Sequence, residues 1–499
     1  MSYEAVIGLE VHVQLKTDTK MFCRCPSVFG AEPNTHVCET CLGYPGTLPI
    51  LNRRAVEQAI RLAAALGASI NPCSIFARKN YFYADLPKGY QISQFDRPLA
   101  EHGRLSLSRH DKTIHITRLH LEEDAGKLLH QAPGGAPLDG ESLVDFNRCG
   151  SPLLEIVSEP EIRTPAQAAD YFQSLHQILL YTGTSEANLE EGNLRCDANV
   201  SIRPVGETAL GTRTEIKNLN SFRHVAKAVE HEIERQIAIV ESGDAVVQST
   251  LTWDADRNRT RVLRSKEEAH DYRYFPEPDL LPLLLSSERL DAAKAGLPEL
   301  PAAKRDRFEN ELGLTRQDAE TLTQTPAIAE YFEAVAQGAS FTPQVAANWI
   351  KTEILRILKD EGTELDAAPV PGRVAALINL VEQDALSSSA GKAVLLEMWS
   401  SDEPPGKIAT RLGLVQERDT ETLQRWIFEA MEAFPSQVEQ YRAGKEQLAG
   451  FFVGKVMAVS KGTADPKLVS ALLRELLARE LPSREDLSPE DLSSEEPRP

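Results

Sequence analysis

The chain is 499 residues long, with 42% hydrophobic residues, 26% charged residues and a formal net charge of −20. This length predicts two to four domains with ample material for a core. No apolar run approaches the roughly 20 residues that span a bilayer, and the N-terminus lacks the basic and apolar regions of a signal peptide. We therefore expect a cytoplasmic protein without a membrane partner. The acidic charge argues against a general nucleic-acid coat and against DNA as a partner, although local basic patches could still bind RNA.

A strand pattern covers residues 5–15. Leu9, Val11, Val13 and Leu15 fall on one face, whereas Glu10 and His12 fall on the other, because successive side chains of a strand point to opposite sides. A single histidine on a strand is usually just hydrogen-bonded. A glutamate and a histidine side by side are also a plausible pair of ligands for a hard cation or a phosphate-bound metal.

Four of the seven cysteines form two short pairs, Cys23-x-Cys25 and Cys38-x-x-Cys41. This spacing is typical of a tetrahedral zinc site. Because the protein would supply all four ligands, no open position remains for a substrate, and the pattern favours a structural zinc over a catalytic one. The alternative is four unrelated reduced cysteines.

The segment Arg78–Phe95 is rich in tyrosine and lysine and is interrupted by a proline and a glycine. It fits a surface loop with aromatic packing. Lys79, Tyr81 and Lys88 could equally hold a phosphate group and stack on a base. The segment by itself leaves both interpretations open.

Residues 114–124 form another predicted strand with one apolar and one polar face. Glu122 lies on the polar face, and Glu123 and Asp124 crowd the end of the strand. Adjacent carboxylates repel each other unless they spread into water or share a cation. A further strand pair is predicted at 143–158.

The stretch Glu190–Arg223 has the pattern that matters most for function. Residues 194–203 alternate between apolar side chains and polar side chains of both charge signs, and the alternation resumes at 213–217 after a turn. The polar set is Arg195, Asp197, Asn199, Glu215 and Lys217, followed by Asn218 and Asn220. A solvated sheet face explains one such strand. Several strands of this kind indicate the floor of a polar pocket that binds phosphate and metal.

The helical patterns define the rest of the chain. Helices are predicted at 53–66, 165–181 and 223–242, and a strand at 250–264. From about residue 286 the helical period dominates. We expect a sheet-based cradle domain with the zinc site at 1–290, a helical domain at 291–405, a helical tail domain at 406–478 and a disordered acidic segment at 479–499.

Three lysines, Lys455, Lys461 and Lys467, gather near the start of the last predicted helix. Helix N-termini and lysines both favour phosphate. This patch could therefore bind RNA within an acidic half of the chain. A solvated loop is the more common reason for such lysines on a surface.

Several predicted strands thus combine an apolar face with a face of Glu, Asp, His, Asn, Arg and Lys, and helices follow them, which indicates an α+β protein with an antiparallel sheet. No Walker-type loop, dinucleotide fingerprint or kinase-like glycine loop accompanies them. A carboxylate-lined sheet that holds a nucleotide through magnesium is the remaining way to activate a substrate with ATP.

Residues 3–285 carry a dense series of motifs: IGLEVHVQL, CETCLGYPGTLP, KNYFYADLPKGYQISQFD, LHLEEDAGK, PLLEIVSEP, EEGNLRCDANVSIR, TEIKNLNSF and RSKEEAHDYRYFPEPDL. With these motifs the chain resembles the B-subunit family of the aspartyl/glutamyl-tRNA amidotransferases. A looser likeness, which includes GFFVGKVM and SKGTADPKLV, continues to about residue 478.

The resemblance implies a cradle domain like the glutamine synthetase catalytic fold, then a helical domain and a small tail that touches tRNA. It implies phosphorylation by ATP, and then amidation, of the side-chain carboxylate of Glu or Asp misacylated onto tRNA(Gln) or tRNA(Asn). An A subunit would hydrolyse glutamine and pass on ammonia, and a small C subunit would complete a heterotrimer. No amidase signature is present in this chain, so ammonia must come from another one.

The resemblance also implies roles for individual residues. Magnesium would be held near Glu10, His12 and the Glu122–Glu123 pair. The catalytic pocket floor would comprise Arg195, Asp197, Glu215 and Lys217, and the nucleotide would contact Lys79, Tyr81, Lys88, Asn199, Asn218 and Asn220. From the residues themselves we expect zinc at the four paired cysteines and tRNA at the three tail lysines.

Two other classes of function stay open. One is a non-catalytic tRNA-binding scaffold, against which the polar strand faces argue. The other is a free-standing ligase that acts on small amino acids, against which the long helical half argues. An ATPase assay with and without misacylated tRNA separates all three.

Overall fold

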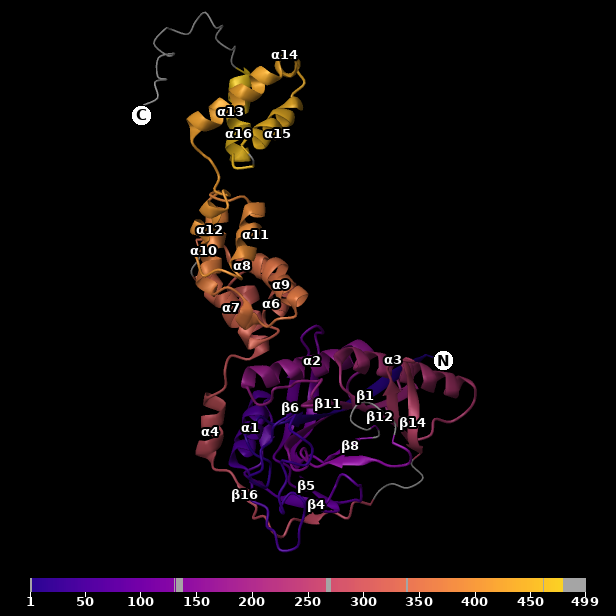
Figure 1. The fold of residues 1–499 in the computed structure, drawn as a ribbon. Helices are drawn as coiled ribbons and strands as arrows, with labels where there is room; N and C mark the ends of the chain where they lie inside the picture. Colours follow the sequence, from indigo (N-terminus) through magenta and orange to yellow (C-terminus); the bar gives the residue numbers. More distant parts are fainter. Residues whose placement is uncertain are drawn as a thin grey trace, which may run out of the picture. The chain divides into compact units, whose positions relative to one another are not determined.

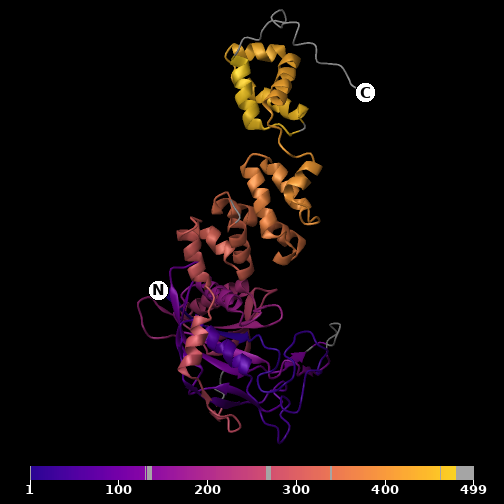
Figure 2. The ribbon, with the colours of Figure 1, turned by 90° about the vertical axis from the view of Figure 1, so that its left-hand side faces the viewer.

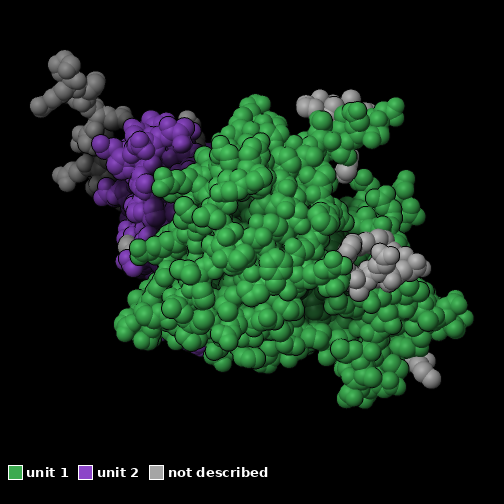
Figure 3. Space-filling view, turned by 90° about the horizontal axis from the view of Figure 1, so that it is seen from below, with its two compact units in different colours: residues 1–308, 323–326 green, residues 309–322, 327–499 purple. Residues whose placement is uncertain are grey.

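The computed structural model describes residues 2–129, 131, 138–265, 271–337, 340–460 and 462–478. The chain divides into two compact units, residues 1–308 with 323–326 and residues 309–322 with 327–499 (Figure 3). The first unit contains the sheets, and the described elements of the second are helices. The predicted acidic segment 479–499 lies outside the described residues.

A nine-stranded sheet is the centre of the described part of the first unit. Its spatial order is β14-β13-β12-β11-β1-β10-β7-β6-β2. Neighbouring strands run antiparallel except β12 and β13, which are parallel because helix α3 (Phe222–Glu241) connects them as a crossover. The strands are β1 (Tyr3–Gln14), β2 (Ser69–Ile70), β6 (Ala100–Ser106), β7 (Thr113–Glu123), β10 (Pro152–Ser158), β11 (Leu194–Pro204), β12 (Thr214–Leu219), β13 (Ser249–Asp254) and β14 (Arg259–Ser265).

Helices α1 (Arg53–Ala65), α2 (Pro165–Thr182) and α3 pack on the apolar face of this sheet, and Figure 1 shows α2 and α3 lying along it. Each begins after a residue whose side chain accepts backbone N–H groups, namely Asn52, Thr164 and Ser221. These three predicted helices are confirmed to within one residue at each end. Because these helices cover the apolar face of the sheet, its polar face remains available for a functional site.

Three smaller sheets complete the described part of this unit. The first has the order β15-β4-β5, and the other two are the pairs β16-β3 and β8-β9. Their bounds are β3 (Cys73–Ser74), β4 (Phe76–Asn80), β5 (Tyr90–Gln94), β8 (Lys127–Leu129), β9 (Leu143–Asp145), β15 (Phe275–Pro276) and β16 (Leu283–Leu284). The segment Arg78–Phe95 is therefore more than a loop, since it contains paired strands at both ends.

Two details of the predicted strands are wrong. Residues 250–264 form not one strand but the hairpin of β13 and β14, because the turn between them reverses the chain. The strands at 143–158 exist, but β9 pairs with β8, whereas β10 lies between β1 and β7. Which strands pair depends on contacts between residues that are far apart in the sequence, and the local alternation of side chains does not encode these contacts.

The remaining described elements are helical (Figure 2). They are α4 (Ser287–Ala295), α5 (Pro301–Asn310), α6 (Arg316–Leu322), α7 (Pro326–Gln337), α8 (Pro343–Trp349), the π-helix η1 (Ile350–Ile354), α9 (Leu355–Glu361), the 3₁₀-helix η2 (Leu365–Ala367), α10 (Pro371–Glu382), α11 (Ser388–Glu397), α12 (Pro405–Arg411), α13 (Thr420–Ala433), α14 (Pro435–Arg442), α15 (Leu448–Val459) and α16 (Pro466–Ala478). Helices α13 to α16 enclose a core of their own around Ile427, Phe452 and Leu473. A separate tail domain from residue 406 stays a prediction.

None of the described helices is both long enough and apolar enough to cross a bilayer.

Candidate functional site

A row of charged side chains crosses the polar face of the main sheet. The register places Arg195 of β11 opposite His12 of β1, His12 opposite Glu155 of β10, and Glu155 opposite His120 of β7. Directly opposed residues on one face of a sheet lie within side-chain contact. The sheet thus joins four residues that are far apart in the sequence.

His12 and Glu155 are the centre of this row. Nε2 of His12 lies 3.5 Å from Oε2 of Glu155, 3.8 Å from Oε1 of Glu10 and 3.8 Å from Oε1 of Glu122. Nε2 of His120 lies 3.4 Å from the same Glu155 oxygen and 3.6 Å from Oε2 of Glu122. Two imidazoles and three carboxylates therefore share one patch.

Burial and neighbouring charges together shift the pKa values of three residues in this patch. Burial lowers the pKa of His12, but its contact with the Glu155 carboxylate raises that pKa overall to about 9. Burial, reinforced by the Glu155 charge, raises the pKa of Glu10 to about 7. Burial would raise the pKa of Glu155, yet His120 and His12 hold it well below its usual value. The carboxylates of the patch therefore favour a positive charge next to them, as the raised pKa of His12 shows.

Two sets of potential metal ligands meet at His12. The sets are Glu10, His12 and Asp197, and His12, Glu122 and Glu155; within each set the ligand atoms lie within 4.8 Å of one another. Carboxylate oxygens suit hard divalent cations, and imidazole nitrogen suits several transition metals. Chemically, this face could hold one or two divalent cations.

Basic side chains flank the acidic patch. Nη2 of Arg195 lies 2.8 Å from Oδ2 of Asp124. Nζ of Lys217 lies 2.7 Å from Oδ2 of Asp197 and 2.8 Å from Oε1 of Glu215. Because each cation is oriented by a carboxylate, a phosphate group would meet donors that are already held in place.

A bulge in β12 positions one of these carboxylates. The β11–β12 register shifts between Cys196 and Ala198, and Asn218 adopts a φ of 61°. The backbone N–H of Asn218 donates to Oδ1 of Asp197 at 2.9 Å. Asn218, which the sequence singled out for its side chain, thus also acts through its main chain.

A cavity of about 200 Å³ lies over this patch. It brings together eight of the predicted residues: His12, Lys79, Tyr81, Glu122, Arg195, Asp197, Lys217 and Asn218. Gln91, Asp124, Ala125 and Leu153 complete its lining. Nζ of Lys79 lies 5.8 Å from the centre of the Tyr81 ring, which also lines the cavity, so the cavity combines charge with aromatic surface.

Other predicted residues do not line this cavity. Glu10 and Glu215 contact residues that do line it. Asn199 lines a second cavity, of about 240 Å³, two residues along β11 from Asp197. Asn220 is exposed beyond the end of β12.

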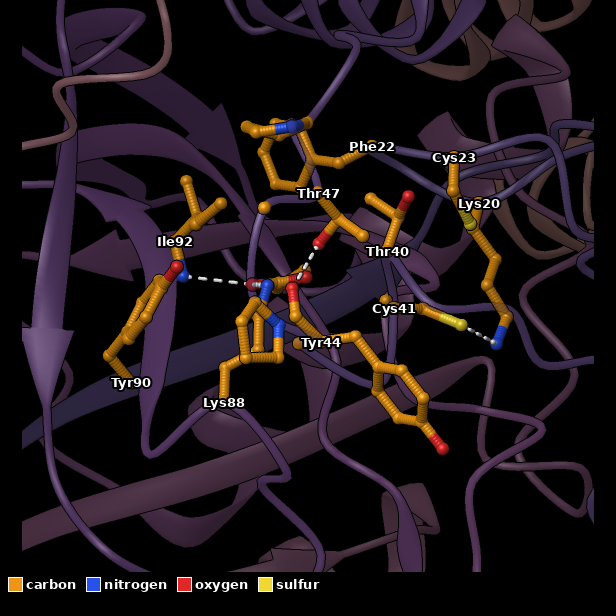
Figure 4. A pocket seen from close by; sticks show the side chains of 16 residues that line it. Lys20, Phe22, Cys23, Thr40, Cys41, Tyr44, Thr47, Lys88, Tyr90 and Ile92 are labelled. Atoms are coloured by element: carbon orange, nitrogen blue, oxygen red, sulfur yellow. Dashed lines mark hydrogen bonds and ion pairs between the residues drawn. The ribbon is translucent and has the colours of Figure 1, made fainter.

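Glu122 and Glu123, expected to act together at magnesium, point to opposite sides of β7. Glu123 accepts the backbone N–H of Ile92 at 3.0 Å and forms an ion pair with Lys88. Glu123 and Lys88 line a third cavity, of about 220 Å³, beside the cysteines (Figure 4). Among the described residues Glu123 belongs to neither set of potential ligands. Side chains alternate along a strand, so only Glu122 reaches His12.

The four predicted zinc ligands form a compact cluster. One Sγ atom from each of Cys23, Cys25, Cys38 and Cys41 lies within 4.8 Å of the others, and all four cysteines are free of disulfides. Contact with Cys23 lowers the pKa of the Cys41 thiol to about 4 although its burial opposes this. Nζ of the buried Lys20 lies 3.6 Å from Sγ of Cys41. This cluster is a possible metal site.

Sequence reasoning left Glu155, His120 and Asp124 out of the proposed site. Glu155 and His120 are buried, at 5% and 3% exposure. A charged residue in the apolar run PLLEIV was an available signal, since a buried carboxylate requires a partner. Its partners, however, come from neighbouring strands whose order only the fold determines.

The predicted tRNA-binding lysines lie in the second unit. The ammonium of Lys455 lies 4.6 Å from the centre of the Phe434 ring, and Nζ of Lys467 lies 2.8 Å from Oδ1 of Asp384. Lys461 lies outside the described residues. Lys455 and Lys467 therefore each have a contact within the protein, which a phosphate group would have to share or replace.

The fold and the site define a class of protein: a mixed α+β chain whose large, mostly antiparallel sheet carries clustered carboxylates and histidines beside lysine and arginine, followed by a helical C-terminal region. Sequence profiles narrow this class. Residues 5–291 match the GatB/GatE catalytic domain, and residues 330–477 match the GatB domain.

Curated relatives agree with these profiles. The chain is 53% identical to the B subunit of the aspartyl/glutamyl-tRNA(Asn/Gln) amidotransferase of Geobacter sulfurreducens over 482 residues, which is 96% of this chain and 100% of that protein. It is 50% identical to the protein of the same name from Myxococcus xanthus, over 95% of this chain and 98% of the relative. The chain belongs to the family of the aspartyl/glutamyl-tRNA(Asn/Gln) amidotransferase B subunits.

Proposed function

We propose that this chain uses ATP to phosphorylate the side-chain carboxylate of Glu or Asp misacylated onto tRNA(Gln) or tRNA(Asn), and then aminates it. The products are Gln-tRNA(Gln) or Asn-tRNA(Asn). The observation that carries the proposal is the meeting of two potential metal-ligand sets at His12, on the floor of a cavity flanked by lysine and arginine. The names of the two relatives support it.

The chemistry requires two steps, because a carboxylate is a poor electrophile. Transfer of the γ-phosphoryl group of ATP to a carboxylate oxygen makes an acyl phosphate and releases ADP. Attack of ammonia on the acyl carbon then breaks the C–O bond, expels phosphate and leaves the amide after loss of a proton. Lys79, Arg195 and Lys217 line the cavity and would stabilise the charge on the transferring group.

The donor set of the patch fits magnesium bound together with nucleotide phosphates, since Mg²⁺ prefers a few carboxylates plus phosphate oxygens. The residues that would hold it are Glu10, His12, Glu122, Glu155 and Asp197. When bound, magnesium supplies positive charge at the phosphates of ATP. Glu155 takes the place of Glu123 in this proposal, because Glu123 lies on the side of the cysteines.

The position of the second cavity supports one orientation of the nucleotide along the sheet. Asn199, Ser201 and Gly8 line it on the same face of β1 and β11 as the acidic patch. We place the nucleoside there, with its phosphates extending along the strands towards His12. The amide of Asn199 then offers a hydrogen bond to the ribose or the base.

The rest of the chain fits the same assignment. The cysteine cluster suits a structural zinc ion, because all four of its ligands are protein thiols. The first unit is proposed to resemble the glutamine synthetase catalytic fold, residues 291–405 to form a helical domain, and the tail domain at 406–478 to contact tRNA. We propose that a glutaminase A subunit supplies ammonia, that a small C subunit completes the heterotrimer, and that the complex works in the cytoplasm.

Measurement of ATP turnover by the assembled complex tests this function. We expect turnover that depends on misacylated tRNA, and amide formation when glutamine or ammonia is added. A scaffold protein would give no tRNA-dependent turnover, and a free-standing ligase would accept free glutamate or aspartate. Assays with Glu-tRNA(Gln) and Asp-tRNA(Asn) in parallel determine which of the two is a substrate.

A further inference from the structure

We propose that four arginines on α1 and α4 form a docking site for the sugar-phosphate backbone of the tRNA substrate, an inference that rests on the proposed function. The arginines are Arg53, Arg54, Arg61 and Arg289, called here the α1–α4 arginine cluster. Helices α1 and α4 lie side by side in the first unit (Figure 1). The cluster is distinct from the tail lysines, which belong to the second unit.

The helical period of α1 builds one side of the site. Val56, Ala59 and Ala63 face the core, so the opposite side of the helix presents Arg53, Glu57 and Arg61 at intervals of four residues. Residues at this spacing are neighbours on a helix surface. Arg289 of α4 and the small residues Ala292 and Gly296 close a cavity of about 340 Å³ against this stripe. This volume is sufficient for a phosphate group with part of its ribose.

Positive charge exceeds negative charge in this cavity. Of the described residues that line it, four are arginines and one, Glu57, is an acid. Glu57 is shared among three of them: Oε1 lies 2.8 Å from Nε of Arg53 and 3.8 Å from Nη2 of Arg289, and Oε2 lies 3.9 Å from Nη1 of Arg54. One carboxylate cannot neutralise four guanidinium groups. A local excess of three positive charges stands in a chain whose net charge is −20.

Two guanidinium groups also have donors without an acceptor. Among the described residues, Nε of Arg61 and Nη2 of Arg289 are buried and lack a hydrogen-bond partner. Nη2 of Arg61 donates to the carbonyl oxygen of Gly296 at 3.2 Å, which holds this side chain between the two helices. A buried donor without an acceptor costs free energy. A phosphate oxygen is an acceptor that matches the planar guanidinium fork, and it would satisfy these donors once the two side chains turn towards the cavity.

The position of α4 supports a binding role over a packing role. None of its residues is buried, and only Leu290 and Ala293 pack partly against the core. A helix with so little apolar burial contributes little to the stability of the core. Its position beside α1 nevertheless completes the cavity and contributes Arg289 to it.

The ligand is identified by this chemistry. A polyanion that approaches an acidic chain meets repulsion except at local basic patches. The patch has no aromatic residue among its described lining, so it offers no platform for stacking bases and suits backbone phosphates instead. The tRNA is the polyanionic substrate of the proposed reaction, and contacts of this kind would position it independently of its sequence.

The test compares an Arg61→Gln/Arg289→Gln variant with wild type in the complete complex with its partner subunits. We expect the Kd for an unacylated transcript of the substrate tRNA to rise about tenfold and the slope of log Kd against log salt to fall by about two, one unit for each lost phosphate contact. The Arg289→Lys variant should lose less affinity for the tRNA, because it keeps the positive charge and loses only the planar guanidinium group. Lys127→Gln, which removes an exposed cation of β8 that is not among the described lining of this cavity, is the control and should leave both quantities unchanged.

Activity at saturating tRNA separates this inference from the proposed function. We expect the double variant to amidate at the wild-type kcat with a raised KM for tRNA. An unchanged Kd and salt slope in a folded variant would overturn the cluster as an RNA site, even if wild type amidates normally. Loss of subunit assembly with unchanged tRNA affinity of the isolated chain would also overturn it, and would identify the cluster as a protein contact. Failure of wild type to amidate would instead refute the proposed function.

Discussion

His12 and Glu155 face each other across the β1–β10 ladder, with Nε2 of His12 3.5 Å from Oε2 of Glu155. The contact matters because His12 belongs to both sets of potential metal ligands and Glu155 to one of them. Glu155 also contacts His120 on the next strand. A change at either residue of the pair should therefore disturb the whole patch.

The first prediction concerns Glu10 and His12. We expect Glu10→Gln and His12→Ala each to lower tRNA-dependent ATP turnover on the order of 100-fold or more. Each substitution removes a ligand of the proposed magnesium ion, and with it the positive charge that stabilises the transferring phosphoryl group. The fold and the assembly of the complex should stay intact. His115→Ala, which changes an exposed histidine of β7, is the matched control. Normal amidation by both purified site variants would contradict the magnesium assignment.

Asn218 offers a test that separates its side chain from its main chain. Asn218→Gly keeps the positive φ and the N–H that donates to Asp197, whereas Asn218→Val cannot adopt this φ without strain. If the main chain is what matters, the glycine variant stays within about threefold of wild-type turnover and the valine variant loses at least tenfold. Steady-state ATPase assays of both variants are sufficient. Equal losses in the two would show that the amide side chain contacts the nucleotide.

The cysteine cluster should bind one zinc ion per chain. Four clustered thiolates repel one another unless a cation holds them. Removal of the metal with a chelator, or the Cys38→Ser substitution, should therefore lower the Tm of the first unit before it affects the second. Elemental analysis of anaerobically purified protein and calorimetry provide the measurements. Cys73→Ser, at a half-buried cysteine outside the cluster, should change neither the metal content nor the Tm.

Glu232 predicts a pH-dependent contribution to stability. This fully buried carboxylate accepts the Thr214 hydroxyl at 2.7 Å and lies 2.7 Å from Nη2 of Arg235. Burial would raise its pKa, but the bonds from Arg235, Gln236 and Thr214 lower it below the usual value. The folded pKa is thus lower than the unfolded one, so the contribution is complete above an unfolded pKa of about 4.3 and is lost as the pH falls through the folded pKa.

The Glu232→Gln variant should accordingly lose roughly 1.5–3 kcal/mol of unfolding free energy at pH 7, the range for hydrogen bonds to a charged group. The difference from wild type should shrink as the pH falls below about 4. Urea unfolding at several pH values measures both. The exposed Glu234 of the same helix gives the control substitution, Glu234→Gln, for which we expect no comparable pH-dependent loss.

The tail lysines lead to the last prediction. Deletion of residues 406–499 should raise the KM for misacylated tRNA while the pocket still binds ATP. Charge reversal at Lys455, Lys461 and Lys467 should weaken tRNA binding and its salt dependence, each lost contact contributing on the order of 1 kcal/mol. The ion pair of Lys467 with Asp384 means that a variant of Asp384, such as Asp384→Asn, should strengthen binding slightly. Unchanged tRNA affinity in an assembled charge-reversal complex would show that the tail does not bind tRNA through this patch.

Local patterns in the sequence were sufficient to predict several features of this structure. The alternation of β1 and β11 predicted which side chains face the core, since a strand repeats every two residues. Helical patterns predicted the bounds of α1, α2 and α3 to within one residue. The spacing of the cysteines predicted the thiol cluster. Each of these features depends on interactions between residues that are close along the chain.

Tertiary structure alone decided which of the polar residues meet. Glu155 and His120 join His12 because β10 lies between β1 and β7. Asn218 reaches Asp197 with its backbone because a bulge shifts the β11–β12 register. Strand order and register follow from burial of the whole apolar face beneath the helices, and a shift of one residue would move every side chain to the other face. No short stretch of sequence contains that constraint, because it is satisfied only by the packed sheet.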